Sequence, residues 1–194
     1  MEQDPPNMHR HTNPDGSIGG WVAATASVSP TAHIGEYAQI YGNARISDNA
    51  RISGNAQIYG DAQIYGHARV AGNARVYGDA QVFGYARVYG DARVYGDAQI
   101  YGDARVSGDA QIYGNAQTSG TAQIYQGSWR ESPPQMMCGR WQGYSPAPGR
   151  MVIGCQDHTI DYWREHIHDI AKTYDATPFE TQCALVLLQI IEGV

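Results

Sequence analysis

A six-residue period dominates the chain from Trp21 to Tyr125 and runs through it without an insertion. Its typical phrases are Ala-Arg-Val-Tyr-Gly-Asp and Ala-Gln-Ile-Tyr-Gly-Asn. Every sixth residue from Val22 to Ile124 is Val or Ile, except for Thr118. A period of six fits neither an α-helix nor one alternating strand. It therefore predicts an array of short strands separated by corners.

Each position of the repeat has a physical role. The β-branched residue stiffens a short strand and points inward, and the small residue two positions earlier, usually Ala, fits where the walls converge. The Gly with Asp or Asn that follows accepts the tight geometry of a corner. One such unit cannot bury its apolar side alone, so the units are expected to stack into a solenoid.

These repeats resemble the hexapeptide, left-handed parallel β-helix family, in which three hexapeptides form one triangular coil. The resemblance implies the left-handedness, because the general rule for parallel crossovers is right-handed. Eighteen hexapeptides then form six coils, which rise roughly 28 Å at the usual spacing of strands. The expected fold class is an all-β solenoid of about six coils with a small C-terminal α-helical hairpin.

Four segments are expected along the chain. They are a flexible N-terminal segment and cap over 1–20, the β-helix over 21–127, an irregular linker or wrap over 128–150, and a strand with a two-helix module over 151–194.

Two helix starts can be read in the last segment. Thr159 is a suitable N-cap for the first helix, and Thr177 with Pro178 and Glu180 has the pattern of a capping box with a first-turn proline. The body of the second helix, residues 184–191, is apolar on nearly all sides. This predicts an oligomer or deep docking of that helix.

Charge and composition exclude several classes of protein. The net charge is −6, and residues 151–194 hold two basic residues against seven acids, so a nucleic acid duplex is not an expected partner. No apolar run is long enough to span a bilayer and no signal peptide begins at Met1, so no membrane partner is expected. We expect a soluble protein of the cytoplasm, with its three cysteines as reduced thiols.

Sorting the repeat by eighteen separates three outward faces. Stacked aromatic residues occupy the first face and the middle of the second. They are Tyr41, Tyr59, Tyr77, Tyr95 and Tyr113 on the first face, and Tyr65, Phe83 and Tyr101 on the second. Stacked rings and amides stabilise neighbouring strands, and this structural role alone accounts for the aromatic columns on both faces.

The third face differs because it carries four arginines, Arg51, Arg69, Arg87 and Arg105, with Tyr85 and Tyr89 nearby. Like charges on adjacent strands repel unless acids, solvent or a bound anion screen them. Guanidinium groups bind phosphates through paired hydrogen bonds, and aromatic rings stack on bases. These six residues are therefore the candidate ligand-binding site.

The phrase Gly19-Gly20-Trp21-Val22, with the dense repeats after it, resembles phage and prophage members of the family that are often labelled transferases. The phrase from Ile153 to Trp163 resembles the C-terminal helical module of the phage members. The resemblance implies a homotrimer, and the host cytoplasm if the chain is phage-encoded. For the enzymes of this fold it implies acyl transfer from coenzyme A at a groove between subunits, with a catalytic histidine.

Catalytic residues are not evident in this chain. His67, at a corner, is a weak candidate, and His33 lies on a strand, but no interrupting loop supplies a shielded groove for either. The carbonic anhydrases of this fold place several histidines together, which two isolated ones do not reproduce. No metal is expected either, because Asp161, Glu165 and either His168 or Asp169, which would share one helix face, fit a solvated face better than a ligand set.

Three hypotheses for function remain open. The first is a non-catalytic trimer that binds or sequesters a small, anionic, nucleotide-like ligand, without a cofactor. The second is a coenzyme A-dependent acyltransferase. The third is a structural or virion-associated scaffold trimer.

Overall fold

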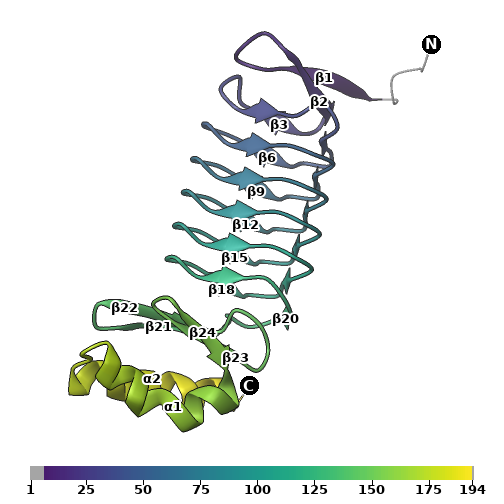
Figure 1. The fold of residues 1–194 in the computed structure, drawn as a ribbon. Coiled ribbons are helices and arrows are strands. Elements are labelled where there is room, and N and C mark those ends of the chain that lie inside the picture. The colour runs from purple at the N-terminus through teal and green to yellow at the C-terminus, as the bar shows by residue number, and fades with distance from the viewer. Residues whose placement is uncertain (1–6, 194) are drawn as a thin grey trace.

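The computed structural model describes residues 7–193. It confirms the expected fold class, a parallel β-solenoid of about six coils followed by two helices (Figure 1). Residues 1–6 of the expected flexible segment lie outside the described residues. The N-terminal hairpin lies at one end of the solenoid, and a small sheet with the two helices lies at the other (Figure 1).

Three sheets form the walls of the solenoid, and neighbouring strands in a sheet lie one coil apart, except for β1 and β2, which form a hairpin. The first is β1 (Met8–Thr12), β2 (Ile18–Ala23), β5 (Gln39–Ile40), β8 (Gln57–Ile58), β11 (Arg75–Val76), β14 (Arg93–Val94), β17 (Gln111–Ile112) and β20 (Ser128–Trp129). The second is β3 (Ser27–Val28), β6 (Arg45–Ile46), β9 (Gln63–Ile64), β12 (Gln81–Val82), β15 (Gln99–Ile100) and β18 (Gln117–Thr118). The third is β4 (His33–Ile34), β7 (Arg51–Ile52), β10 (Arg69–Val70), β13 (Arg87–Val88), β16 (Arg105–Val106) and β19 (Gln123–Ile124).

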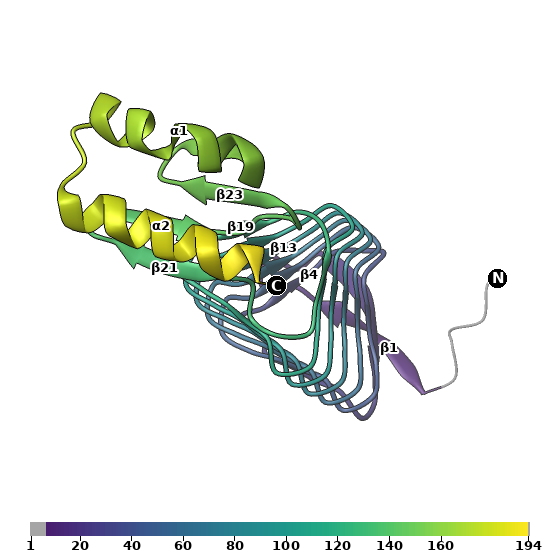
Figure 2. The same ribbon diagram turned by 90° about the horizontal axis from the view of Figure 1, so that it is seen from below.

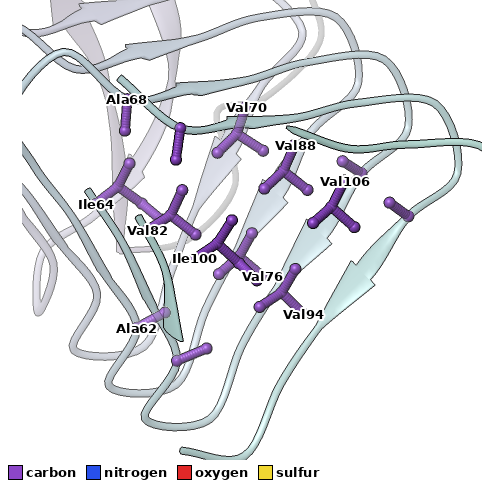
Figure 3. Close-up of a cluster of buried hydrophobic side chains, with 14 of the residues drawn as sticks. Ala62, Ile64, Ala68, Val70, Val76, Val82, Val88, Val94, Ile100 and Val106 are labelled. Atoms are coloured by element: carbon purple, nitrogen blue, oxygen red, sulfur yellow. The ribbon is translucent and has the colours of Figure 1, made fainter. Parts of the chain in front are cut away.

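The core of the solenoid consists of the inward residues that the six-residue period identifies. The Val and Ile side chains of the three walls point toward one another, as Val70, Val82 and Val94 do in Figure 3. From Ile34 to Ile112 every one of them is buried, with at most 1% of its surface exposed, and so are the alanines between them. Because each coil repeats the same packing, the core is one continuous column.

The corners explain the glycines of the repeat. Gly78, for example, has φ +70°, a left-handed conformation that side chains with a Cβ rarely adopt. A Cβ at this position would lie 2.9 Å from the backbone nitrogen of Gly96 in the next coil. The corner therefore requires glycine both for its own backbone angle and for the close approach of the coil that stacks on it.

The N-terminal end differs from the flexible segment that we expected over 1–20. Strands β1 and β2 form an antiparallel hairpin that adds one strand to the first sheet. Arg10 lies over the ring of Trp21, with its guanidinium carbon 5.0 Å from the ring centroid. The first coil of a solenoid exposes unpaired backbone groups and apolar surface, and this hairpin covers part of that edge.

The C-terminal end also differs, because residues 128–150 are not an irregular linker. Strand β20 extends the first sheet, and its Trp129 closes the solenoid core. Beyond it, an antiparallel sheet consists of β21 (Gln135–Cys138), β22 (Trp141–Tyr144), β23 (Arg150–Ile153) and β24 (Gln156–Thr159). Gly139 and Gly154, both with positive φ, lie in two-residue turns between paired strands. This is the usual turn of a tight hairpin.

This small sheet is the middle of three layers. Tyr144 and Val152 belong to the solenoid core, whereas Met151 and Ile153 pack with the helices. Figure 2 shows α1 (Ile160–Thr173) and α2 (Pro178–Glu192) side by side next to β21 and β23. The expected strand at Met151 is thus part of a sheet that joins the solenoid to the helices.

Both helix starts are confirmed. The Thr159 hydroxyl accepts a hydrogen bond from the backbone of Tyr162, and Thr177 with Glu180 forms a complete capping box. The apolar surface that we expected on α2 is only partly covered by the rest of the chain, because Phe179 remains 65% exposed and Ile190 remains 44% exposed. Among the described helices, none is long and apolar enough to cross a membrane.

Candidate anion-binding face

The third sheet brings the four predicted arginines together. In its parallel register, Arg51 lies opposite Arg69, Arg69 opposite Arg87, and Arg87 opposite Arg105. We call these four residues the arginine column. All four are exposed, and His33 and Gln123 occupy the same position in the strands at either end. The column is therefore continuous over four coils.

The arginine column has no ion-pair partner in the part of the chain that the structure describes. The ion pairs there involve other arginines, such as Arg150 with Asp157 and Arg164 with Asp161 and Glu192. Four neighbouring guanidinium groups without carboxylates in contact repel one another, and only solvent ions and acids at the corners screen this repulsion. The column is a place where an anion would be stabilised.

Corner residues on either side make the column uneven in charge. Two residues before the arginines stand Asn49, His67, Tyr85 and Asp103, and four residues after them stand Asn55, Asn73, Asp91 and Asp109. Asp48, in the same corner as Asn49, places one acid before Arg51, whereas Arg69 has no acid at either corner. Arg87 has an acid at one corner, and Arg105 has one at both. Arg69 is consequently the member of the column with the fewest acids around it, and its in-register neighbour Arg51 extends the positive strip.

The corner after the arginines is ordered by side-chain hydrogen bonds along the axis. The Asn55 amide donates to Asn73 Oδ1 at 3.1 Å, and the Asn73 amide donates to Asp91 Oδ1 at 3.0 Å. These bonds run from coil to coil and orient the amides. Beside Arg51 and Arg69 this border is therefore neutral and polar.

The outward residue between the arginines and this border is small in most coils. Its column reads Gly35, Ser53, Ala71, Tyr89, Ser107 and Tyr125. Tyr89, predicted as a site residue, is 39% exposed. It stands next to Arg87 on the outer surface, with Val88 between them pointing inward. The outward side chains of this column are small at Ser53 and Ala71 and large at Tyr89.

The two other predicted candidates lie on the opposite border. The rings of His67 and Tyr85 stack, with centroids 5.0 Å apart and planes 7° from parallel, and both side chains are exposed. Among the described residues, no side chain donates to or accepts from His67. A general base needs an orienting partner, which the geometry around His67 does not supply.

His33 lies in a cleft of about 280 Å³ at the N-terminal end of the column, lined by Pro14, Asp15, Thr31, His33, Asn49 and Arg51. Hydrogen bonds from Ser17 lower the pKa of the Asp15 carboxyl, and the nearby charge of His33 contributes to the same shift. Sequence reasoning missed Asp15 because the N-terminal hairpin, which carries it over the first coil, was expected to be flexible.

The aromatic ladders of the other faces are present as predicted. On the first face the five tyrosines from Tyr41 to Tyr113 stack with centroids 4.7–5.0 Å apart and planes within 10° of parallel. On the second face Tyr65, Phe83 and Tyr101 stack at 4.8 and 5.1 Å. Burial raises the pKa of Tyr41, Tyr65 and Tyr77. These contacts stabilise the coils against one another.

The C-terminal module shows no comparable site. Within residues 7–193, no three His, Cys, Asp or Glu side chains are placed to hold a metal ion. Asp161 pairs with Arg164 at 2.6 Å, and the His166 ring stacks on Tyr162. Burial raises the pKa of the Cys138 thiol to about 11, so this cysteine is protonated at neutral pH and a poor nucleophile.

A comparison with models of protein families finds a match to the repeat. The model of the YdcK beta solenoid repeat matches residues 38–54, 44–60, 62–78, 86–98 and 98–111. The chain is a repeat β-helix protein. Every residue of the arginine column lies within a matched segment, so the column belongs to the regular part of the repeat. No curated protein and no solved structure matches this chain.

Proposed function

We propose that this protein binds a small, anionic, nucleotide-like ligand on the arginine column without turning it over. The observation that carries the proposal is the in-register pair Arg51 and Arg69. Both are exposed, neither has an ion-pair partner among the described residues, and the corners beside Arg69 carry no acid.

The spacing of the column suits phosphate groups. Neighbouring strands lie about 4.8 Å apart, so arginines in consecutive coils present their forks at that interval. Each guanidinium can donate two parallel hydrogen bonds to one phosphate, and one phosphate can also bridge two arginines. A ligand with two phosphates would engage Arg51 and Arg69 together.

The test is a pair of double variants with binding measured by calorimetry. R51Q/R69Q removes Arg69, which has no acid at either corner, together with its in-register neighbour Arg51. R75Q/R93Q removes two exposed, in-register arginines from the first face and is the matched control. Pyrophosphate, a panel of nucleotides and coenzyme A are titrated against each. Glutamine occupies the same outward position elsewhere in both sheets, so both variants should fold.

We expect R51Q/R69Q to weaken pyrophosphate and nucleotide binding by at least about tenfold, because a hydrogen bond to a charged group contributes about 1.5–3 kcal/mol. R75Q/R93Q should bind within about twofold of the wild type. R87Q/R105Q should have an intermediate effect, because acids stand beside those arginines. Equal affinities for the wild type and R51Q/R69Q would overturn the proposal.

Acyl transfer is the alternative that the family resemblance supplies. If the protein were an acyltransferase, His67→Ala would abolish acetyl transfer from acetyl coenzyme A while leaving pyrophosphate affinity unchanged. The exposed His67, stacked on Tyr85 and without an orienting partner, supports the binding function over this one.

Self-assembly as a homotrimer is part of the same proposal. Its support is the exposed apolar surface of α2, where Phe179 and Ile190 remain uncovered in one chain. Light scattering on the full chain at micromolar concentration would measure the assembly. A truncated chain that lacks residues 177–194 should assemble less well or lose solubility, and a monomeric full chain would contradict the trimer.

A further inference from the structure

Each ladder of this solenoid shows how a ring fills one level of a column. Tyr59 lies between Tyr41 and Tyr77, with centroid distances of 4.9 and 4.7 Å, so one coil spacing accommodates one aromatic ring. Both ring faces of Tyr59 are thereby covered. A ring without such neighbours leaves its faces open for a planar group of a ligand.

The ring of Tyr89 has no stacked aromatic neighbour of this sort. The register of the third sheet places Ala71 one coil before it and Ser107 one coil after it, so its column holds no ring at either adjacent level. No aromatic side chain of the described chain stacks on Tyr89, which is 39% exposed. Its column has a vacant ring position on both sides.

The surrounding charges distinguish these two positions. At the level of Ala71 the borders are Arg69 and Asn73, and at the level of Ser107 they are Arg105 and Asp109. A phosphorylated ligand is repelled by Asp109 and attracted by Arg69. Beyond Ala71, the level of Ser53 has Arg51 and Asn55 as its borders, so the cationic strip continues in that direction.

We propose that the ligand is a nucleotide whose base stacks on the ring face of Tyr89 that is directed toward Ala71, while its phosphates bind Arg51 and Arg69. This inference rests on the proposed function and adds a position for the base. Ala71 leaves room for the base because its side chain is a single methyl group. The asparagines of the border supply amide groups that can hydrogen-bond to the edge of the base.

Two variants test the stacking, with adenosine diphosphate and pyrophosphate as the probes. Tyr89→Ser removes the ring, and Ser already occupies this column at positions 53 and 107. Ala71→Tyr fills the vacant ring position with a residue that the column accepts at positions 89 and 125. Neither variant alters an arginine. Circular dichroism and thermal unfolding establish that both are folded.

In the wild type, adenosine diphosphate should bind more tightly than pyrophosphate by roughly 5- to 100-fold, the contribution of one stacked base. Both variants should lose this difference and keep their affinity for pyrophosphate. The adenine protons should shift upfield in the NMR spectrum of the wild-type complex and not in that of Tyr89→Ser. The matched control, Ser107→Tyr, should bind adenosine diphosphate as the wild type does. Tyr85→Ser tests whether the base lies on the other border instead.

The outcomes separate this inference from the proposed function. If pyrophosphate binds through the arginines but adenosine diphosphate binds no more tightly, or if Tyr89→Ser keeps the difference, the stacking is wrong and the anion site stands. If Tyr85→Ser alone removes the difference, the base lies on the other border and the inference is also wrong. If neither probe binds the wild type, both proposals fail.

Discussion

The side chain of Asn13 pairs with the backbone of Ile34 as an additional strand would. Asn13 Oδ1 accepts a hydrogen bond from the Ile34 N–H at 2.8 Å, and Asn13 Nδ2 donates to the Ile34 carbonyl at 3.1 Å. His11 Nε2 lies 3.2 Å from the carbonyl oxygen of Ala32 in the same strand region. Both side chains are buried, so the N-terminal hairpin satisfies the first edge of the third sheet with side chains.

Replacing Asn13 with Ala should therefore destabilise the protein. The substitution leaves a backbone donor and an acceptor of Ile34 unpaired in a buried place, which costs about 1–3 kcal/mol. Chemical denaturation measures the loss. Asn43→Ala is the control, because the Asn43 amide donates to Asp61 on the exposed surface, and its effect should stay within about 0.5 kcal/mol. Equal effects of the two variants would contradict this account of the cap.

Gly78→Ala should destabilise the solenoid more than Gly149→Ala does. Both glycines have nearly the same positive φ, +70° and +72°, but a Cβ at Gly78 would meet the backbone of Gly96, whereas Gly149 has nothing within 4 Å. The backbone angle alone costs about 1 kcal/mol in each, and the forced displacement of a coil should add about 1–3 kcal/mol at Gly78. Urea denaturation of both variants separates the two contributions. Equal decreases in the free energy of unfolding would show that the next coil shifts without a cost in stability.

Thr118→Val should stabilise the protein. Thr118 occupies an inward Val or Ile position, is fully buried, and its hydroxyl has no hydrogen-bond partner among the described residues. Valine has nearly the same shape without the polar group, so the gain should be about 1 kcal/mol. The reverse change, Val82→Thr in the same sheet, is the control and should destabilise. A thermal unfolding midpoint that falls in Thr118→Val would mean that the hydroxyl has a partner in solution.

The stability of the C-terminal module should depend on the ionisation of Glu180. The backbone N–H of Thr177 donates to this carboxylate at 2.8 Å, and this bond, with that of Arg140, lowers the pKa of Glu180 below its ordinary value of 4.5. Because the folded pKa is the lower one, the stabilisation is present above pH 4.5 and is lost as the pH falls through the folded pKa.

Glu180→Gln should accordingly lower the unfolding midpoint at pH 7 and reduce its dependence on pH below 4.5. Thermal unfolding of both proteins between pH 7 and pH 3 checks this. Glu165→Gln, at an exposed helix position, should leave the curve unchanged. Parallel curves for the wild type and Glu180→Gln would show that the capping box makes no contribution through its charge.

Much of the fold could be predicted from the sequence because the repeat is a local signal. Each six-residue unit specifies its own strand, inward residue and corner, and eighteen such units repeat the same environment. The arginine column and the tyrosine ladders follow from the coil length, which the family resemblance supplied. The caps at Thr159 and Thr177 are also local, since a cap bonds to a residue three positions away.

What only the tertiary structure decided lies at the two ends of the solenoid. The hairpin that holds Asn13 against Ile34, and the sheet over residues 135–159, join residues that no period links. The cleft between Asp15 and His33 depends on that hairpin, and the open faces of Tyr89 depend on which neighbours the register assigns to it. The repeat determines how one coil stacks on the next. The ends lack a next coil, so long-range contacts that cover the exposed edges determine their structure.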